Sequence, residues 1–174
     1  MAGNRSVSQP LPPLTDALEL LERAVSYARV SFHAVVPASL GAPTPCSRWD
    51  LGRLLVHMED SLCTLQAAAD VGQVAMIPAE PDDPDHPVVS LKWRACALLG
   101  AWSAHDGAEL VSVAGSPLAA QTLVAAGALE IAVHAWDVAR ACGSELPIPG
   151  ALAEALLSLV PHLISELDRG TRFG

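Results

Sequence analysis

The sequence has 174 residues, of which 51% are hydrophobic and 4% aromatic, and its formal net charge is −9. This length is typical of one domain with an ample core. The negative charge argues against nucleic acid and anionic lipid as partners, because both require a basic surface. We therefore expect no nucleic-acid partner and no membrane partner, and the candidate metal site described below favours a small-molecule substrate.

The first 13 residues, MAGNRSVSQPLPP, combine polar side chains with three prolines. This composition predicts a disordered segment. It lacks the apolar core of a secretory signal, which favours a cytoplasmic protein. The most apolar run, 118–136, contains Glu130 and His134 and so does not fit a membrane span.

Apolar residues at helical spacing predict five helices, at residues 16–36, 50–71, 88–105, 118–142 and from after Pro149 to about 167. Asp16 and Glu19 have the spacing of a capping box for the first of them. The proline-rich stretch 72–87 predicts a long crossover connection, and the short VSVAG segment at 111–115 could be extended.

Four long helices with one long crossover indicate an all-α fold, a four-helix bundle. The additional C-terminal helix would pack outside the bundle or cover one end. We expect one domain at 14–168, followed by a tail at 169–174.

The most informative segment is LVAAGALEIAVHAWDVARA, in the fourth predicted helix. Glu130 and His134 are four residues apart, so they lie on one helical face among small apolar residues. A buried carboxylate is costly unless it is paired, and no Lys or Arg lies three or four residues from Glu130. A bound metal ion would resolve this cost; a simple Glu–His hydrogen bond or a solvent-facing pair is the alternative.

His57 lies on the apolar side of the second predicted helix and is a candidate third ligand, although a packed core histidine is the alternative. Two histidines and one glutamate leave an open position on a metal, as in catalytic zinc sites. Asp60 and Asp137 each follow a candidate histidine by three residues. Either could orient an imidazole, and either could equally be a surface charge.

The remaining histidines and the cysteines carry weaker signals. We expect His33, His86, His105 and His162 to be surface or packing residues. The four cysteines form no CxxC pair, which predicts free thiols, with Cys46 packed under Trp49. The nucleophile-elbow, P-loop and dinucleotide-binding motifs are missing from the sequence.

Two segments also resemble motifs of a known family. TPCSRWDLGRLLVHM (44–58) resembles T-x-C-x-x-W-(D/S)-x-x-x-L-x-x-H, and EIAVHAWDVARACG (130–143) resembles E-x-x-x-H-x-W-D-x-A-x-x-x-G. Together they are similar to the DinB-like superfamily, and within it to actinobacterial proteins like the N-terminal domain of mycothiol-dependent maleylpyruvate isomerase. The resemblance covers the chain from the first predicted helix to the fifth. Arg48 departs from the usual glycine of the first motif.

The resemblance implies a four-helix bundle with one long crossover and a metal held by His57, Glu130 and His134. The metal would be zinc, or else nickel or another divalent ion. Relatives with known activity are thiol-dependent isomerases or S-transferases that use mycothiol, bacillithiol or glutathione. Bundles of this kind often pair, which makes a homodimer plausible.

The leading hypothesis is a thiol-dependent S-transferase or isomerase in which the metal activates a mycothiol-type thiol. Arg48, Arg53 and Arg140 are candidates to bind the carboxylate of this thiol, and Trp49 is a further candidate substrate-binding residue. One alternative is a non-catalytic metal- or ligand-binding module. Another is a metal-assisted hydrolase or cyclase that acts on a natural-product intermediate.

Overall fold

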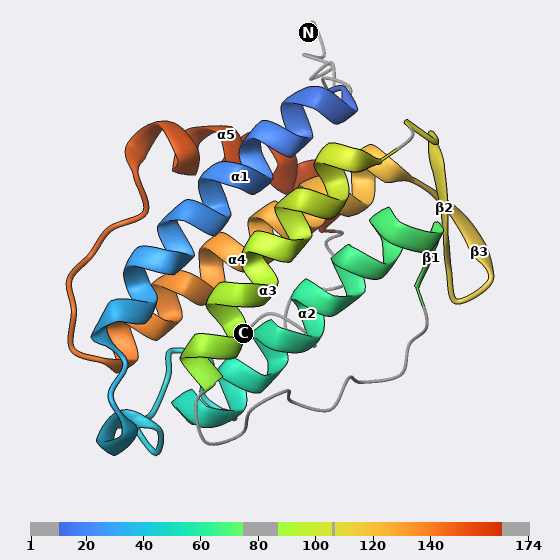
Figure 1. Ribbon diagram of the computed structural model, residues 1–174. Coiled ribbons are helices and arrows are strands. Elements are labelled where there is room, and N and C mark those ends of the chain that lie inside the picture. Colours follow the sequence, from blue (N-terminus) through green and yellow to red (C-terminus); the bar gives the residue numbers. More distant parts are fainter. Residues whose placement is uncertain (1–10, 75–86, 106, 165–174) are drawn as a thin grey trace, which may run out of the picture.

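The computed structural model describes residues 11–74, 87–105 and 107–164, which form a helical bundle (Figure 1). In this part of the chain the α-helices are α1 Leu14–Ser31, α2 Leu51–Val71, α3 Pro87–Ala104, α4 Ala120–Ala141 and α5 Gly150–Leu163. α1 packs along α4, and α2 packs along α3 and α4. α5 lies outside these four helices and contacts α1 and α4. The predicted helical bundle with an additional C-terminal helix is thus confirmed.

A small three-stranded sheet lies at one end of the bundle. β1 (Gln73–Val74) pairs in parallel with β2 (Leu110–Val113), and β2 pairs antiparallel with β3 (Ser116–Ala119). The sequence suggested only one short extended piece here. The sheet forms because α2 and α3 end, and α4 begins, at the same end of the bundle. The segments next to these helix ends can therefore pair.

The sheet also fixes the directions of the helices. β1 follows α2 and β2 follows α3, so both helices run toward the sheet, whereas α4 starts from β3 and runs away from it. Two neighbouring helices that run in the same direction need a connection that returns along the bundle, about 27 Å for an 18-residue helix. This geometry accounts for the predicted crossover, most of which (75–86) lies outside the described residues.

Several helix ends differ from the prediction. α1 begins at Leu14 without a side-chain cap, so the predicted capping box is wrong and Asp16 lies inside the first turn. α1 ends at Ser31, and a 3₁₀ turn (Phe32–Ala34) follows it. α5 ends at Leu163, before the predicted residue 167, and Ile164 is extended. Most of the expected N-terminal segment (1–10) and the expected tail lie outside the described residues.

α2 starts and ends where the sequence indicates. The Asp50 side chain accepts a hydrogen bond of 2.8 Å from the backbone nitrogen of Arg53, which caps the first turn. Gly72 follows the last turn with φ of 66°, a conformation that glycine adopts without a steric penalty. These two caps fix where α2 begins and ends.

α2 and α4 approach each other closely at Gly127. A Cβ atom at this position would lie 2.6 Å from Leu65 Cδ1, well inside van der Waals contact, and Leu65 is buried. The Leu65 side chain therefore packs directly over Gly127, and a larger residue there would force this side chain to shift. Because Glu130 follows Gly127 by one helical turn, the approach also sets how near Glu130 comes to α2.

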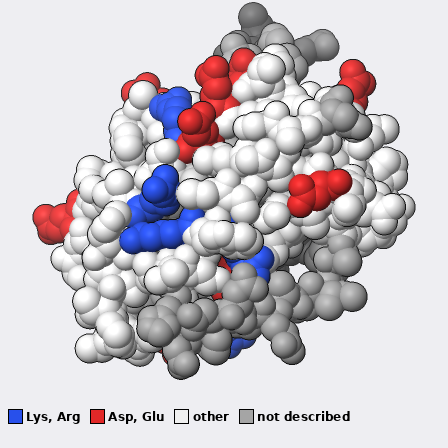
Figure 2. Space-filling model, in the orientation of Figure 1, with Lys and Arg blue, Asp and Glu red and all other residues white. Residues whose placement is uncertain are grey.

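α4 is long and apolar enough to be a candidate membrane span by length and composition, and 56% of its apolar window is buried inside the protein. On the face drawn in Figure 2, charged side chains lie in small groups of either sign, separated by uncharged surface. This face of the molecule thus carries no extended basic surface.

Candidate metal centre

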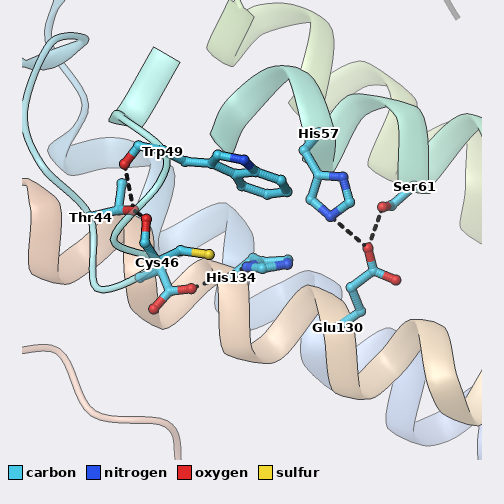
Figure 3. Close-up of polar contacts among 8 residues, drawn as sticks. Thr44, Cys46, Trp49, His57, Ser61, Glu130 and His134 are labelled. Atoms are coloured by element: carbon cyan, nitrogen blue, oxygen red, sulfur yellow. Dashed lines mark hydrogen bonds and ion pairs between the residues drawn. The ribbon is translucent and has the colours of Figure 1, made fainter. Parts of the chain in front are cut away.

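The structure brings His57, Glu130 and His134 together between α2 and α4 (Figure 3). One ligand atom from each residue lies within 4.8 Å of the other two, and all three residues are partly exposed. No other group of this kind occurs in the described ranges. The helical spacing of Glu130 and His134 places both on the α4 face that meets His57.

A direct contact joins the two helices. His57 Nε2 lies 3.0 Å from Glu130 Oε1, with 34% of the histidine side chain and 39% of the glutamate side chain exposed. Ser61 Oγ donates a hydrogen bond of 2.5 Å to the same oxygen. Ser61 follows His57 by one turn of α2, so two successive residues of one helical face contact a single carboxylate oxygen.

The contacts also decide the charge of Glu130. Burial raises the pKa of this carboxyl, but the hydrogen bonds from His57 and Ser61 and the charges of His57 and His134 outweigh burial and hold the pKa below its usual value. Within the described part of the chain, no Lys or Arg forms an ion pair with Glu130. The site thus keeps a carboxylate that has only imidazole and hydroxyl partners.

Asp137 contacts the second imidazole. His134 Nδ1 and Asp137 Oδ2 are 3.1 Å apart, and only 8% of the aspartate side chain is exposed. A carboxylate on Nδ1 holds a histidine in the tautomer that leaves Nε2 free to bind a metal. Asp60, the other candidate for this role, is a partly exposed residue of α2.

Trp49 covers both histidines. Its ring centroid lies 4.6 Å from that of His57 and 6.2 Å from that of His134. The guanidinium carbon of Arg53 lies 5.8 Å from the centroid of the Trp49 ring, within the range of a cation–π contact. The candidate substrate residues Trp49 and Arg53 therefore adjoin the cluster.

The other two predicted substrate-binding residues, Arg48 and Arg140, lack the contact with Trp49 that Arg53 makes. Arg48 is exposed in the loop before Trp49, and Arg140 is exposed in the last turn of α4. Neither makes a hydrogen bond or ion pair with the His57, Glu130 and His134 side chains in the ranges that the structure describes.

The loop that carries Trp49 is held by Thr44, which is buried. The hydroxyl of Thr44 donates to the carbonyl oxygens of Cys46 (3.0 Å) and Trp49 (2.9 Å), and the Trp49 nitrogen donates to the Cys46 carbonyl (2.9 Å). The thiol of Cys46, which we expected to pack under Trp49, points toward the ring of His134 in Figure 3. These bonds account for the threonine of the first motif, whereas cysteine and tryptophan take part in them through backbone atoms alone.

The donor set fits a divalent metal. Zinc binds imidazole nitrogen and carboxylate oxygen at about 2.0–2.2 Å, so two donors on one ion lie up to about 4 Å apart. The separations within the cluster need only small side-chain adjustments to reach this range. Three protein donors that remain partly exposed leave room for a further ligand.

Ser61 and Thr44 were not among the residues predicted for the site. The signal for Ser61 was its position four residues after His57, on the same helical face. Thr44 was present in the motif, but a loop has no periodicity from which its contacts could be inferred.

The fold agrees with comparisons to known proteins. Residues 21–139 match the family model described as mycothiol maleylpyruvate isomerase N-terminal domain. Since the match covers more than half of the chain, the protein belongs to this family.

Individual relatives extend this result. Two uncharacterised proteins from strains of Mycobacterium tuberculosis, MT0763 and Rv0738, are each 28% identical over 138 residues, which is 75% of this chain and 70% of theirs. The crystal structure of the mycothiol-dependent maleylpyruvate isomerase aligns with a TM-score of 0.64 at 21% identity, over 84% of this chain and 67% of that one. A histidine-to-alanine mutant of that enzyme aligns with the same TM-score. At this identity the structural likeness shows the shared fold.

Proposed function

We propose that this protein is a metal-dependent enzyme of the mycothiol type, an S-transferase or isomerase, whose divalent metal is held by His57, Glu130 and His134. The observation that supports this proposal is the convergence of these three partly exposed donors in a chain of this family. Zinc is the ion best suited to two imidazoles and one carboxylate.

The chain's own residues would prepare the site for this chemistry. Asp137 would hold the ring of His134, and Ser61 would hold the carboxylate of Glu130. Bound there, a divalent metal supplies positive charge that keeps a thiol in its nucleophilic thiolate form near neutral pH. Trp49 would form an apolar wall that limits the access of water to the thiolate.

Arg53 would donate hydrogen bonds to the amide carbonyl or hydroxyl oxygens of a mycothiol-type thiol. Its guanidinium is held against Trp49, one helical turn before His57. A fixed guanidinium loses less conformational entropy when it binds an oxygen acceptor than a free one does. Arg48 and Arg140 are weaker candidates, since they have no such contact with the cluster.

Metal content is the first test. We would load the purified protein with zinc, remove excess ion and measure metal per chain, then repeat this for His57→Ala, Glu130→Gln and His134→Ala. We expect about one ion per chain in the wild type and an affinity loss of more than a hundredfold in each variant, beyond the 10–100-fold typical of residues that only orient ligands. His33→Ala, which removes an exposed histidine of another element, is the matched control. Wild-type protein that retains no zinc or nickel would contradict the proposal.

Thiol binding is the second test. Titration of mycothiol into the zinc-loaded protein should show saturable binding that is lost in the metal-free protein. Arg53→Ala should weaken binding about tenfold, because a charge-assisted hydrogen bond contributes about 1.5 kcal/mol or more. Arg140→Ala should leave binding unchanged. Zinc-loaded protein without saturable thiol binding would instead favour a non-catalytic metal-binding module.

A further inference from the structure

Glu130 accepts hydrogen bonds from His57 and Ser61, and a bound metal ion would affect these two bonds differently. Both His57 Nε2 and Ser61 Oγ contact Oε1, while Oε2 receives no hydrogen bond from any described residue. In the contact with Glu130, His57 Nε2 carries the proton, whereas a metal ligand must offer the lone pair of that nitrogen. The hydrogen bond from His57 is therefore incompatible with His57 acting as a ligand.

The hydrogen bond from Ser61 is free of this conflict. Its hydroxyl donates to one carboxylate oxygen and needs no change when His57 turns its lone pair toward an ion. Ser61 is also well placed to be rigid, because it lies in the middle of α2, one turn after His57, and its partner lies on α4 across the close contact at Gly127. Ser61 is thus the contact of Glu130 that can persist in both states.

We infer that Ser61 is a positioning residue of the proposed metal centre, which holds Oε1 of Glu130 so that the carboxylate stays directed toward His57 and His134. Without the hydroxyl, Glu130 would have only the bond that metal binding removes, and its side chain could rotate toward solvent, since it is partly exposed. Ordering that side chain would then oppose metal binding. This inference rests on the proposed function, because it presumes that the three donors hold an ion.

The test compares zinc affinity, measured by competition with a chromogenic chelator, in the wild type, Ser61→Ala and Ser61→Thr. We expect Ser61→Ala to bind zinc 10–100-fold more weakly, the range for residues that orient ligands. Ser61→Thr keeps the hydroxyl and should stay within about threefold of the wild type. Ser103→Ala removes an equivalent helical hydroxyl from α3, which bonds only a backbone carbonyl, and should have no effect.

Cobalt binding adds a readout that a merely structural role would not change. The visible absorption of bound Co²⁺ reports ligand geometry, so it should differ between Ser61→Ala and the wild type and be restored in Ser61→Thr. Equal zinc affinity in Ser61→Ala and the wild type would overturn the inference while leaving the metal site intact. Weak binding in both Ser61 variants, with helicity retained, would also overturn it, since it would assign Ser61 a packing role. Absence of metal binding by the wild type would instead overturn the proposed function.

Discussion

Two carboxylates, Glu59 and Glu130, lie on opposite sides of α2, and the residues that pair with them differ in kind. On the side toward α3, Glu59 is 2% exposed and accepts hydrogen bonds from Ser90 and, at 2.9 Å, from Arg94 Nε. On the side toward α4, Glu130 meets His57 and Ser61 and has no described Lys or Arg partner.

The difference lies in what neutralises each carboxylate. Arg94 is a permanent cation, so the charge of Glu59 is compensated by the protein itself. Imidazoles are neutral over much of the physiological pH range and can offer lone pairs to an ion, so the cluster at Glu130 can accept a cation from outside. The comparison teaches that the type of partner, more than burial, separates a structural carboxylate from a candidate ligand.

The largest expected effect is the loss of Arg94. Arg94→Met should lower the free energy of unfolding by about 3–5 kcal/mol, because it removes the guanidinium that pairs with the buried carboxylate of Glu59. Zinc affinity should remain at the wild-type level in this variant. The measurement is urea denaturation of the metal-free protein, together with the chelator competition.

The matched variants for Arg94 sharpen the contrast. Glu130→Gln should change stability by less than about 1 kcal/mol, as expected for a partly exposed group, yet abolish metal binding. Glu59→Leu combined with Arg94→Met should recover much of the lost stability, since an apolar pair often replaces a buried ion pair at little cost. Comparable unfolding losses in Arg94→Met and Glu130→Gln would invalidate the distinction between the two clusters.

The next effect concerns Asp137. Asp137→Asn should weaken zinc binding 10–100-fold, because an amide can donate to Nδ1 and so favour the wrong tautomer of His134. Asp70→Asn, at an exposed position of α2, is the control and should bind zinc like the wild type. Unaltered affinity in Asp137→Asn would show that the contact at 3.1 Å does not serve the site.

Gly127 and Gly100 should respond to alanine with opposite signs. Gly127→Ala should destabilise the protein by about 1 kcal/mol, because the strain against Leu65 exceeds the gain in helix propensity. It should also weaken zinc binding, because the Leu65 side chain must shift between α2 and α4, the helices that carry the three donors. Gly100 lies in α3 with no atom within 4 Å of an added Cβ, so Gly100→Ala should stabilise by up to about 1 kcal/mol. Thermal denaturation and zinc affinity measure both variants; stabilisation by Gly127→Ala would show that the helices are not in tight contact.

The smallest effect is the pH dependence of metal-free stability. The pKa of Glu130 is lower in the folded protein than its usual value, so the folded state favours the ionised form. This contribution is fully present above the usual carboxyl pKa of about 4.3 and is lost as the pH falls through the lower folded value. The stability difference between wild type and Glu130→Gln should therefore shrink between about pH 5 and pH 3. A difference that grows on acidification would contradict the stated direction of the pKa.

The sequence predicted the helices and the face of α4 with useful accuracy, since both depend on local spacing. Helical periodicity located α2, and the spacing of Glu130 and His134 placed them on one face. The small sheet was largely missed because its strands are only two to four residues long and pair across distant parts of the chain. The capping box was wrong because Pro13 starts α1 before Asp16, although the pattern at Asp16 and Glu19 was present.

What the sequence determined by itself were the features that repeat every three or four residues: the helices, their apolar faces and the pairing of residues one turn apart, such as Glu130 with His134. Only the tertiary structure decided that Ser61 and His57 share one oxygen of Glu130, that Trp49 covers both histidines and that Arg94 pairs with Glu59. Local spacing fixes which side chains share a helical face, because backbone geometry sets it. Which faces meet depends on packing between helices distant in sequence, as at the contact of Gly127 with Leu65, and no local pattern records that contact.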